Sequence, residues 1–96
     1  MSPVVWTTTA LTDVAGLIET LADVNLDAAE RAAKAIHRAG DSLELNPKRG
    51  LMVQDALGVR RLLVPFGKYG FVIHYAILAA EVVILRVYHG RQQRPT

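Results

Sequence analysis

Hydrophobic and polar positions follow two different periods along this chain. Apolar residues at positions 11, 14, 15, 18, 21 and 22 recur every three or four residues, which predicts one face of an amphipathic helix. A second helix is predicted from Leu26 to about Leu45, with Asn25 as its N-cap and Asn46-Pro47 as its end. Because only a residue or two separates them, the two helices should form an antiparallel hairpin.

The other apolar segments are short, rich in β-branched and aromatic residues, and bounded by turn residues, which is typical of strands. Pro3 to Trp6 is predicted to be a first strand, and residues 46–57 a loop. A three-stranded meander with turns at 66–68 and 79–80 follows; its strands are Val59–Pro65, Tyr69–Leu78 and Glu81–His89. The order β-α-α-β-β-β predicts one α+β domain over residues 1–96, a two-layer sandwich of a helical hairpin on an antiparallel sheet.

Both faces of the predicted meander are mainly apolar, although two helices cover only one of them. With a turn at 79–80, the register places Arg86 opposite Ile73. One face then carries Phe71, Ile73, Tyr75, Ile77, Val82, Ile84, Arg86 and Tyr88, and the other Val72, His74, Ala76, Leu78, Val83, Leu85 and Val87. The uncovered face is a candidate partner-binding surface, unless the 46–57 loop or self-association covers it.

Charge is divided unevenly between the two halves, although the net charge is only +2. Residues 1–46 carry seven acids against three bases, whereas residues 47–96 carry eight bases against two acids. The second half is therefore expected to build a cationic surface that faces nucleic acid or an acidic protein, or that is simply solvated. No apolar run approaches the roughly 20 residues that a membrane span needs, and no secretory signal is apparent, so a cytoplasmic location is expected.

The last predicted strand runs without a linker into a basic tail, residues 89–96, which carries His89, Arg91 and Arg94. A buried strand can present such cations rigidly to an anionic partner; the alternative is a solubilising tail. Arg86 interrupts the strand itself. A mid-strand arginine either pairs with a carboxylate, here Asp55 or an acid of the first half, or belongs to a functional surface.

Other chemistry finds little support in the sequence. The histidines at positions 37, 74 and 89 lack the spacing of metal ligands, and the chain has no cysteine for thiolate sites or disulfides. The serines have no nucleophile-elbow context, and Gly67-Lys68-Tyr69-Gly70 lacks the spacing of a phosphate-binding loop. We therefore expect no metal, no cofactor and no small-molecule substrate.

Several short motifs, in this order, resemble the RelE/ParE superfamily, and in particular its ParE branch. They are Val5-Trp6-Thr7 with Asp13-Val14, Asn25 with Ala28-Ala29, Pro47 and Gly50, Gly58-Val59-Arg60-Arg61-Leu62 with Tyr69 and Tyr75, and the closing segment from Ile84 to Gln92. The resemblance covers nearly the whole chain. It implies the toxin of a type II toxin–antitoxin, or plasmid stabilisation, system that a cognate antitoxin neutralises.

The resemblance implies two alternative targets. ParE-type members inhibit DNA gyrase by binding it, without enzymatic chemistry, whereas RelE-type members cut messenger RNA on the ribosome with basic residues of the central strands and a C-terminal tyrosine. Here Val72 stands where a second-strand arginine is expected, and no tyrosine follows Tyr88. We therefore predict a gyrase inhibitor. The alternatives are a RelE-like endoribonuclease using Arg60, Arg61 and Arg86, or an inactive homologue that only binds antitoxin.

These expectations assign two sets of residues. The residues expected to bind the target are cationic: Arg60, Arg61, Arg86, His89, Arg91 and Arg94. The residues expected to bind the antitoxin are apolar or aromatic: Phe71, Ile73, Tyr75 and Tyr88.

Overall fold

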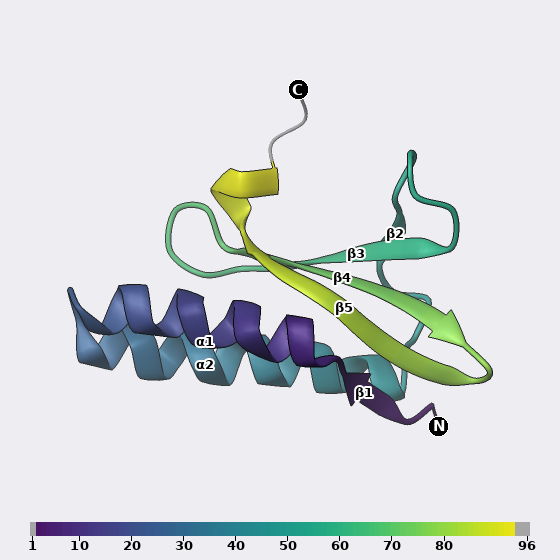
Figure 1. Cartoon of the computed structure of the whole chain (residues 1–96), viewed down its shortest axis with the longest axis horizontal. Coiled ribbons are helices and arrows are strands. Elements are labelled where there is room, and N and C mark those ends of the chain that lie inside the picture. Colours follow the sequence, from purple (N-terminus) through teal and green to yellow (C-terminus); the bar gives the residue numbers. More distant parts are fainter. Residues whose placement is uncertain (1, 94–96) are drawn as a thin grey trace.

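Two helices and a five-stranded sheet form two layers in the computed structural model, which describes residues 2–93 (Figure 1). Helix α1 spans Thr8–Ala22 and helix α2 spans Leu26–Asp41. Both helices have a side-chain cap: the Thr7 side chain accepts a hydrogen bond from the Ala10 amide, and Asn25, the predicted cap, accepts one from the Ala28 amide, each at 3.0 Å. Helix α2 ends earlier than predicted, and the 3-10 turn η1 (Ser42–Glu44) continues it.

The sheet has the strand order β1-β5-β4-β3-β2. Its strands are β1 (Val4–Trp6), β2 (Leu51–Met52), β3 (Val59–Val64), β4 (Phe71–Leu78) and β5 (Glu81–His89), and a second 3-10 turn, η2 (Gly90–Gln93), follows β5. The predicted meander β3-β4-β5 is confirmed, and so is the α+β sandwich. Two details differ: β1 pairs with β5 in parallel, so the sheet is mixed, and β2 forms within the predicted 46–57 loop.

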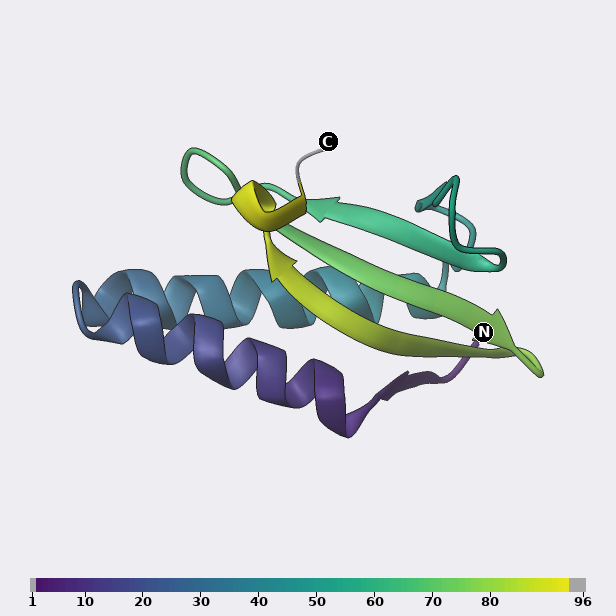
Figure 2. The ribbon, with the colours of Figure 1, turned by 45° about the horizontal axis from the view of Figure 1, so that its top comes forward.

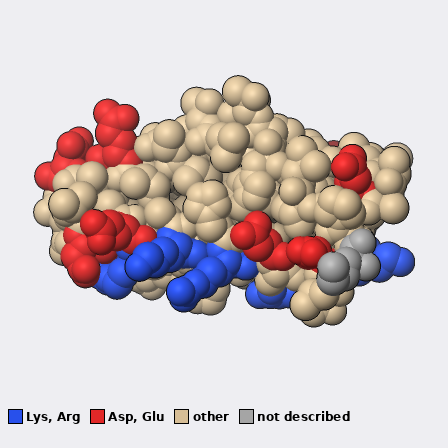
Figure 3. Space-filling model, turned by 90° about the horizontal axis from the view of Figure 1, so that it is seen from below, with Lys and Arg blue, Asp and Glu red and all other residues tan. Residues whose placement is uncertain are grey.

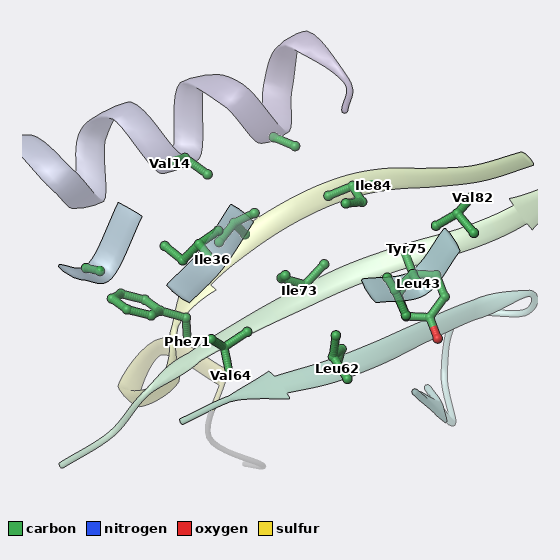
Figure 4. Close-up of a cluster of buried hydrophobic side chains, with 13 residues drawn as sticks. Val14, Ile36, Leu43, Leu62, Val64, Phe71, Ile73, Tyr75, Val82 and Ile84 are labelled. Atoms are coloured by element: carbon green, nitrogen blue, oxygen red, sulfur yellow. The ribbon is translucent and has the colours of Figure 1, made fainter. Parts of the chain in front are cut away.

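The helical layer lies on one face of the sheet, and the apolar core lies between the two layers (Figures 1 and 4). Figure 2 shows α1 running alongside β5, with α2 beneath the neighbouring strands. The largest fully buried side chains are Tyr75, Ile36, Leu43, Ile73, Ile84 and Val82. Burial of a large apolar side chain contributes about 1.5–3 kcal/mol, so this single cluster dominates the stability of the fold.

The predicted register between β4 and β5 holds from the turn to the pair Tyr75–Ile84, and a β-bulge overturns it beyond that pair. Tyr75 pairs with Ile84 and His74 pairs with Arg86, so Leu85 is the extra residue between them. Beyond the bulge every side chain of β5 changes face, because the side-chain period of a strand is two. Arg86 therefore lies beside His74 and not opposite Ile73, and Val87 turns into the core with an exposed fraction of 2%.

Phe71, Ile73 and Tyr75, which were expected to bind the antitoxin, lie on the face of the sheet that the helices cover. All three side chains are buried in the core beneath the helices, with exposed fractions of 3%, 0% and 0% (Figure 4). They are therefore not available as a surface for an antitoxin in this conformation. Tyr88, the fourth residue of that set, pairs with Val72 and lies on the opposite side of the sheet, where it is partly exposed.

Candidate functional surface

Arg86 is bound by a carboxylate of α1. Its Nε donates to Asp13 Oδ2 at 2.8 Å and its Nη2 donates to Asp13 Oδ1 at 3.1 Å, which is a bidentate ion pair. Of the two readings that the sequence left open, carboxylate pairing is the one found, and the partner is Asp13 and not Asp55. The Arg86 side chain is nevertheless 46% exposed.

Asp13 also accepts a hydrogen bond from the part of the β5 edge that has no neighbouring strand. Strand β1 pairs only with residues Val82, Val83 and Ile84, so the second half of β5 has no neighbouring strand on that side. The Thr7 hydroxyl donates to the Leu85 carbonyl at 3.2 Å, and the Val87 amide donates to Asp13 Oδ2 at 2.9 Å. Side chains of α1 and its cap thus take the hydrogen bonds that a strand would otherwise make.

These contacts shift the ionisation of both partners. Partial burial raises the pKa of Asp13, but the hydrogen bonds from Arg86 and from the Val87 amide outweigh burial and hold the pKa below its ordinary 3.8. The hydrogen bonds that Arg86 donates to Asp13 raise the pKa of Arg86 above its usual range. Both groups are therefore charged at neutral pH.

The two arginines of β3 point to opposite faces of the sheet. Arg60 pairs with Tyr75, on the core side, and its Nη1 donates to the carbonyls of Gly50 at 2.8 Å and Lys48 at 3.2 Å. Arg61 pairs with His74, on the other side. The two expected target-binding arginines are therefore not brought together, and Arg60 holds the loop before β2.

The face of the sheet away from the helices, called the open face below, carries a row of basic residues. Arg61, His74 and Arg86 are register partners on three neighbouring strands. The His74 ring lies 5.1 Å from the Tyr88 ring, and the Arg86 guanidinium lies 5.1 Å from the same tyrosine ring. Exposed apolar side chains border the row, among them Leu51, Leu63 and Leu78.

The first residues of the basic tail, His89 to Arg91, lie against the hairpin between β3 and β4. Tyr69 is its contact point: the Lys68 ammonium lies 5.5 Å and the Arg91 guanidinium 5.7 Å from its ring centroid, and the His89 ring lies 5.7 Å away. These four residues are called the tail cluster below. The Gly90 amide donates to the Gly70 carbonyl at 2.8 Å. Arg94 lies outside the described residues.

Gly90 fixes how closely the tail approaches the hairpin. A Cβ atom placed on Gly90 would lie 1.9 Å from the Tyr69 carbonyl oxygen, so no other residue fits without moving the backbone. His89 and Arg91 are therefore held close to the hairpin between β3 and β4.

Two adjoining hollows run between α1 and the second half of β5. The larger, about 590 Å³, is lined by Leu17, Thr20, Leu21, Phe71, His89 and Arg91. The smaller, about 380 Å³, is lined by Thr12, Asp13, Gly16, Leu17, Thr20, Arg86, Val87 and Tyr88. The two share Leu17 and Thr20, and together they are called the trough below.

Positive charge is not confined to the second half of the chain. On the helix-covered side, Lys and Arg side chains gather in one band with Asp and Glu beside it (Figure 3). Helix α2 contributes exposed bases at Arg31, Lys34 and Arg38. Arg31 is paired with Asp27 at 3.0 Å on the same helix. The expected contrast between an acidic first half and a basic second half is therefore weaker on the folded surface.

Sequence reasoning missed Asp13, Lys68 and Tyr69 as parts of a site. Asp13 gave no signal, because its partner lies 73 residues away. Tyr69 stands between Lys68 and Gly70 in a turn, and an aromatic residue beside a cation is a weak local signal.

Within residues 2–93, neither helix has the length and apolar character that crossing a bilayer requires.

The fold is that of a small α+β sandwich with basic residues at the end of its last strand, and comparison with known families identifies the family to which it belongs. The family of the ParE toxin of type II toxin–antitoxin systems, parDE, matches residues 4–94. The chain therefore belongs to the ParE toxin family, as its sequence motifs indicated.

Curated relatives and a solved structure agree with this assignment. The chain is 36% identical to Toxin RelE1 of Caulobacter vibrioides over 78 residues, which cover 81% of this chain and 82% of the relative. It is 32% identical to Toxin RelE2 of the same organism over 90 residues, covering 94% and 97%. A solved structure described as the chromosomal ParDE TA system from P. aeruginosa has the same fold, with a TM-score of 0.77 at 20% identity, covering 93% of this chain and 96% of that one.

Proposed function

We propose that this toxin inhibits DNA gyrase by binding it through the tail cluster, without chemistry of its own, and that a cognate antitoxin neutralises it. The single observation that carries the proposal is the way Tyr69 holds Arg91 and His89 at the end of the sheet. Cations that are already ordered lose little side-chain entropy on binding an acidic surface. Arg94 follows three residues later in the sequence and carries a further positive charge.

The contacts that Arg60 and Arg86 make within the chain support binding of a target protein rather than cleavage of RNA. Arg60 is committed to loop carbonyls and Arg86 to Asp13, so both are already bound within the chain. Cleavage of RNA needs two kinds of groups in one site: cations that stabilise the charge on the phosphate, and an acid or base that transfers a proton. Val72, at the position where a second basic residue was expected, has an exposed fraction of only 3%.

Inhibition of purified gyrase in a plasmid supercoiling assay tests the proposal. Arg91→Glu reverses one charge of the tail cluster, and we expect about tenfold more protein to be needed for half-inhibition. Lys34→Glu makes the same change of charge on the exposed side of α2 and should inhibit like the unmodified chain. Equal inhibition by both variants would contradict the proposal, and no inhibition by the unmodified chain would favour the inactive homologue.

One observation favours a second candidate, the ribosome-dependent endoribonuclease. Arg61, His74 and Arg86 form a row across three strands of the open face, with Tyr88 beside it. Cations, an imidazole and a phenol are the groups that phosphate cleavage uses. Mapping of 5′ ends after incubation with programmed ribosomes decides between the two. Codon-specific cuts that disappear in Arg61→Ala would establish the endoribonuclease, whereas absence of cuts agrees with gyrase binding.

A further inference from the structure

The helical hairpin ends in an exposed apolar turn. Val24 and Leu26 lie where α1 passes into α2, and Val24 is 87% exposed. Neither residue belongs to the core cluster. The amides of Val24 and Asn25 both donate to the Leu21 carbonyl, at 3.0 and 2.8 Å, so the backbone of the turn is fixed. Residues 23–27, called the hairpin tip below, therefore hold two aliphatic side chains in solvent.

Carboxylates flank the two aliphatic side chains of the hairpin tip. Asp23 and Asp27 are exposed, and Asp and Glu side chains gather at the end of the molecule where the hairpin turns (Figures 1 and 3). Asp27 pairs with Arg31, whereas Asp23 has no ion pair within residues 2–93. Asp23 also lies at the carboxyl end of α1, where the helix dipole disfavours a negative charge. A cation from outside the chain would stabilise this carboxylate.

A basic hollow lies beyond the other end of α2. It measures about 520 Å³ and is lined by Leu45, Asn46, Pro47, Lys48 and Arg49. We call it the loop hollow below. Leu45, which is 70% exposed, gives it an apolar wall. Lys48 and Arg49 are exposed, and neither forms an ion pair in the part of the chain that the structure describes. Because a cavity of about 150 Å³ holds a molecule the size of benzene, the loop hollow has room for two aliphatic side chains.

Hydrogen bonds hold the loop hollow open in a fixed shape. The Tyr75 hydroxyl donates to the Pro47 carbonyl at 2.7 Å, and the Arg60 guanidinium donates to the Lys48 carbonyl at 3.2 Å. The Arg49 guanidinium donates to the hydroxyl of Ser42. The loop is therefore ordered before a partner arrives, which lowers the entropy cost of binding.

The hairpin tip and the loop hollow lie at opposite ends of the helical layer (Figure 1). Helix α2 and the turn η1 cover residues 26–44 between them, so about 30 Å separates the two surfaces and they cannot meet within one chain. Their chemistry is complementary, since one has aliphatic side chains between carboxylates and the other has an apolar wall beside two cations. A contact between two different patches of identical chains joins them head to tail.

We propose that the loop hollow binds the hairpin tip of a second copy of this chain, so that toxin molecules associate head to tail. Val24 packs against Leu45 of the next molecule, and Asp23 faces Lys48. Neither surface shares a residue with the tail cluster or the trough, so the inference goes beyond the proposed function and does not depend on gyrase. About five residues a side are far fewer than the roughly 20–30 of a standard interface, so the association is weak and reversible.

Sedimentation velocity of the purified chain, in a concentration series up to about 1 mM, tests the proposal. Two variants each reverse one charge of the contact: Asp23→Lys on the hairpin tip and Lys48→Glu in the loop hollow. Both positions are exposed, so the folds should persist, and circular dichroism verifies this. Lys34→Glu is the matched control, because it makes the same change of charge in the middle of α2.

We expect the weight-average mass to rise from the 10.5 kDa of one chain and to pass that of two chains without a plateau. Each reversal should weaken association about tenfold or more, and Lys34→Glu should not. A mixture of the two reversed chains should associate again, because each tip then meets a hollow of opposite charge. A mass that stays at one chain at every concentration would overturn the inference. So would a plateau at two chains that only one reversal abolishes, because that pattern belongs to a two-fold dimer through a single surface.

Removal of the apolar contact provides an independent test. Val24→Ser deletes an exposed aliphatic side chain that lies outside the core, so the melting temperature should change little while association weakens about fivefold or more. Leu78→Ser makes a similar change at another exposed apolar position, at the end of β4, and should associate like the unmodified chain. Equal weakening by both variants would show that exposed apolar surface aggregates without specificity, and would refute docking of the hairpin tip.

Discussion

Asp13 in α1 and Arg86 in β5 are joined by two hydrogen bonds, of 2.8 and 3.1 Å, although 73 residues separate them in sequence. The same carboxylate accepts the Val87 amide at 2.9 Å. One side chain therefore orients Arg86, closes the edge of β5 and fixes α1 beside it. The position of α1 in turn sets the width of the trough.

Removal of this carboxylate should destabilise the fold. Asp13→Ala deletes charge-assisted hydrogen bonds and leaves the Val87 amide without its acceptor, so we expect a loss of about 1–3 kcal/mol in the free energy of unfolding. Urea denaturation followed by circular dichroism measures it. Asp27→Ala removes an ion pair whose side chains are 62% and 78% exposed, and should change stability by less than about 0.5 kcal/mol. An equal loss of unfolding free energy in both variants would show that the Asp13 contacts contribute no more than an exposed ion pair.

The same contact predicts a dependence on pH. Because the pKa of Asp13 is lowered in the folded chain, its contribution is complete above the unfolded value near pH 4 and is lost as pH falls through the folded pKa. The stability difference between the unmodified chain and Asp13→Ala should thus be constant from about pH 7 to about pH 5 and shrink below about pH 4. Denaturation series at these pH values provide the measurement, and a difference that persists undiminished in acid would rule out the carboxylate as its source.

Tyr75 links the core to the loop before β2. Its hydroxyl donates to the Pro47 carbonyl at 2.7 Å and accepts the Gly50 amide at 2.8 Å, and its ring is fully buried. Tyr75→Phe leaves both backbone groups without this partner and should cost about 1–3 kcal/mol. Hydrogen exchange should quicken most at Gly50. Exchange there at an unchanged rate would mean that the loop does not depend on the hydroxyl.

Tyr69 should act on target binding and not on folding. Tyr69→Leu removes the ring that Arg91 and His89 contact, so it should weaken gyrase inhibition several-fold while the melting temperature changes little. Tyr69→Phe keeps the ring and should inhibit almost normally. The supercoiling assay and thermal melts separate the two effects. A leucine variant that inhibits fully would show that the ring does not position the tail.

The turn between β4 and β5 stores backbone strain. Ala79 and Ala80 both have positive φ, 49° and 66°, which favours Asn or Gly in a hairpin of this kind. The left-handed conformation costs roughly 1–2 kcal/mol for an ordinary residue, so the pair Ala79→Asn with Ala80→Gly should raise the free energy of unfolding by about 1 kcal/mol. Urea denaturation measures the gain, and a loss would indicate that the alanine side chains make a contact of their own.

Much of the fold could be predicted because it depends on local patterns. Asn25 caps the second helix as expected, and the 79–80 turn is where the sequence places it. The extra residue Leu85 could not be predicted, since a bulge leaves no local signal in an apolar strand. That single residue moved Arg86 and Tyr88 to the face away from the helices, and so separated Tyr88 from Phe71, Ile73 and Tyr75.

The site was predicted only where it is contiguous in sequence. His89 and Arg91 were identified because they follow the last strand directly. Their contact with Tyr69 depends on how the tail folds back over Gly70, which the pattern does not reveal. Arg60 and Arg61 looked like one basic pair, yet adjacent strand residues point to opposite faces, so their separation could have been deduced.

The pairing of β1 with β5 has a consequence for synthesis of the toxin. The first strand to leave the ribosome pairs with the last one, Glu81–His89, so the sheet cannot be completed until almost the whole chain has been made. Contacts this distant in sequence form late in folding. The tail cluster includes His89 and Arg91, so it is assembled only after β5 has been made.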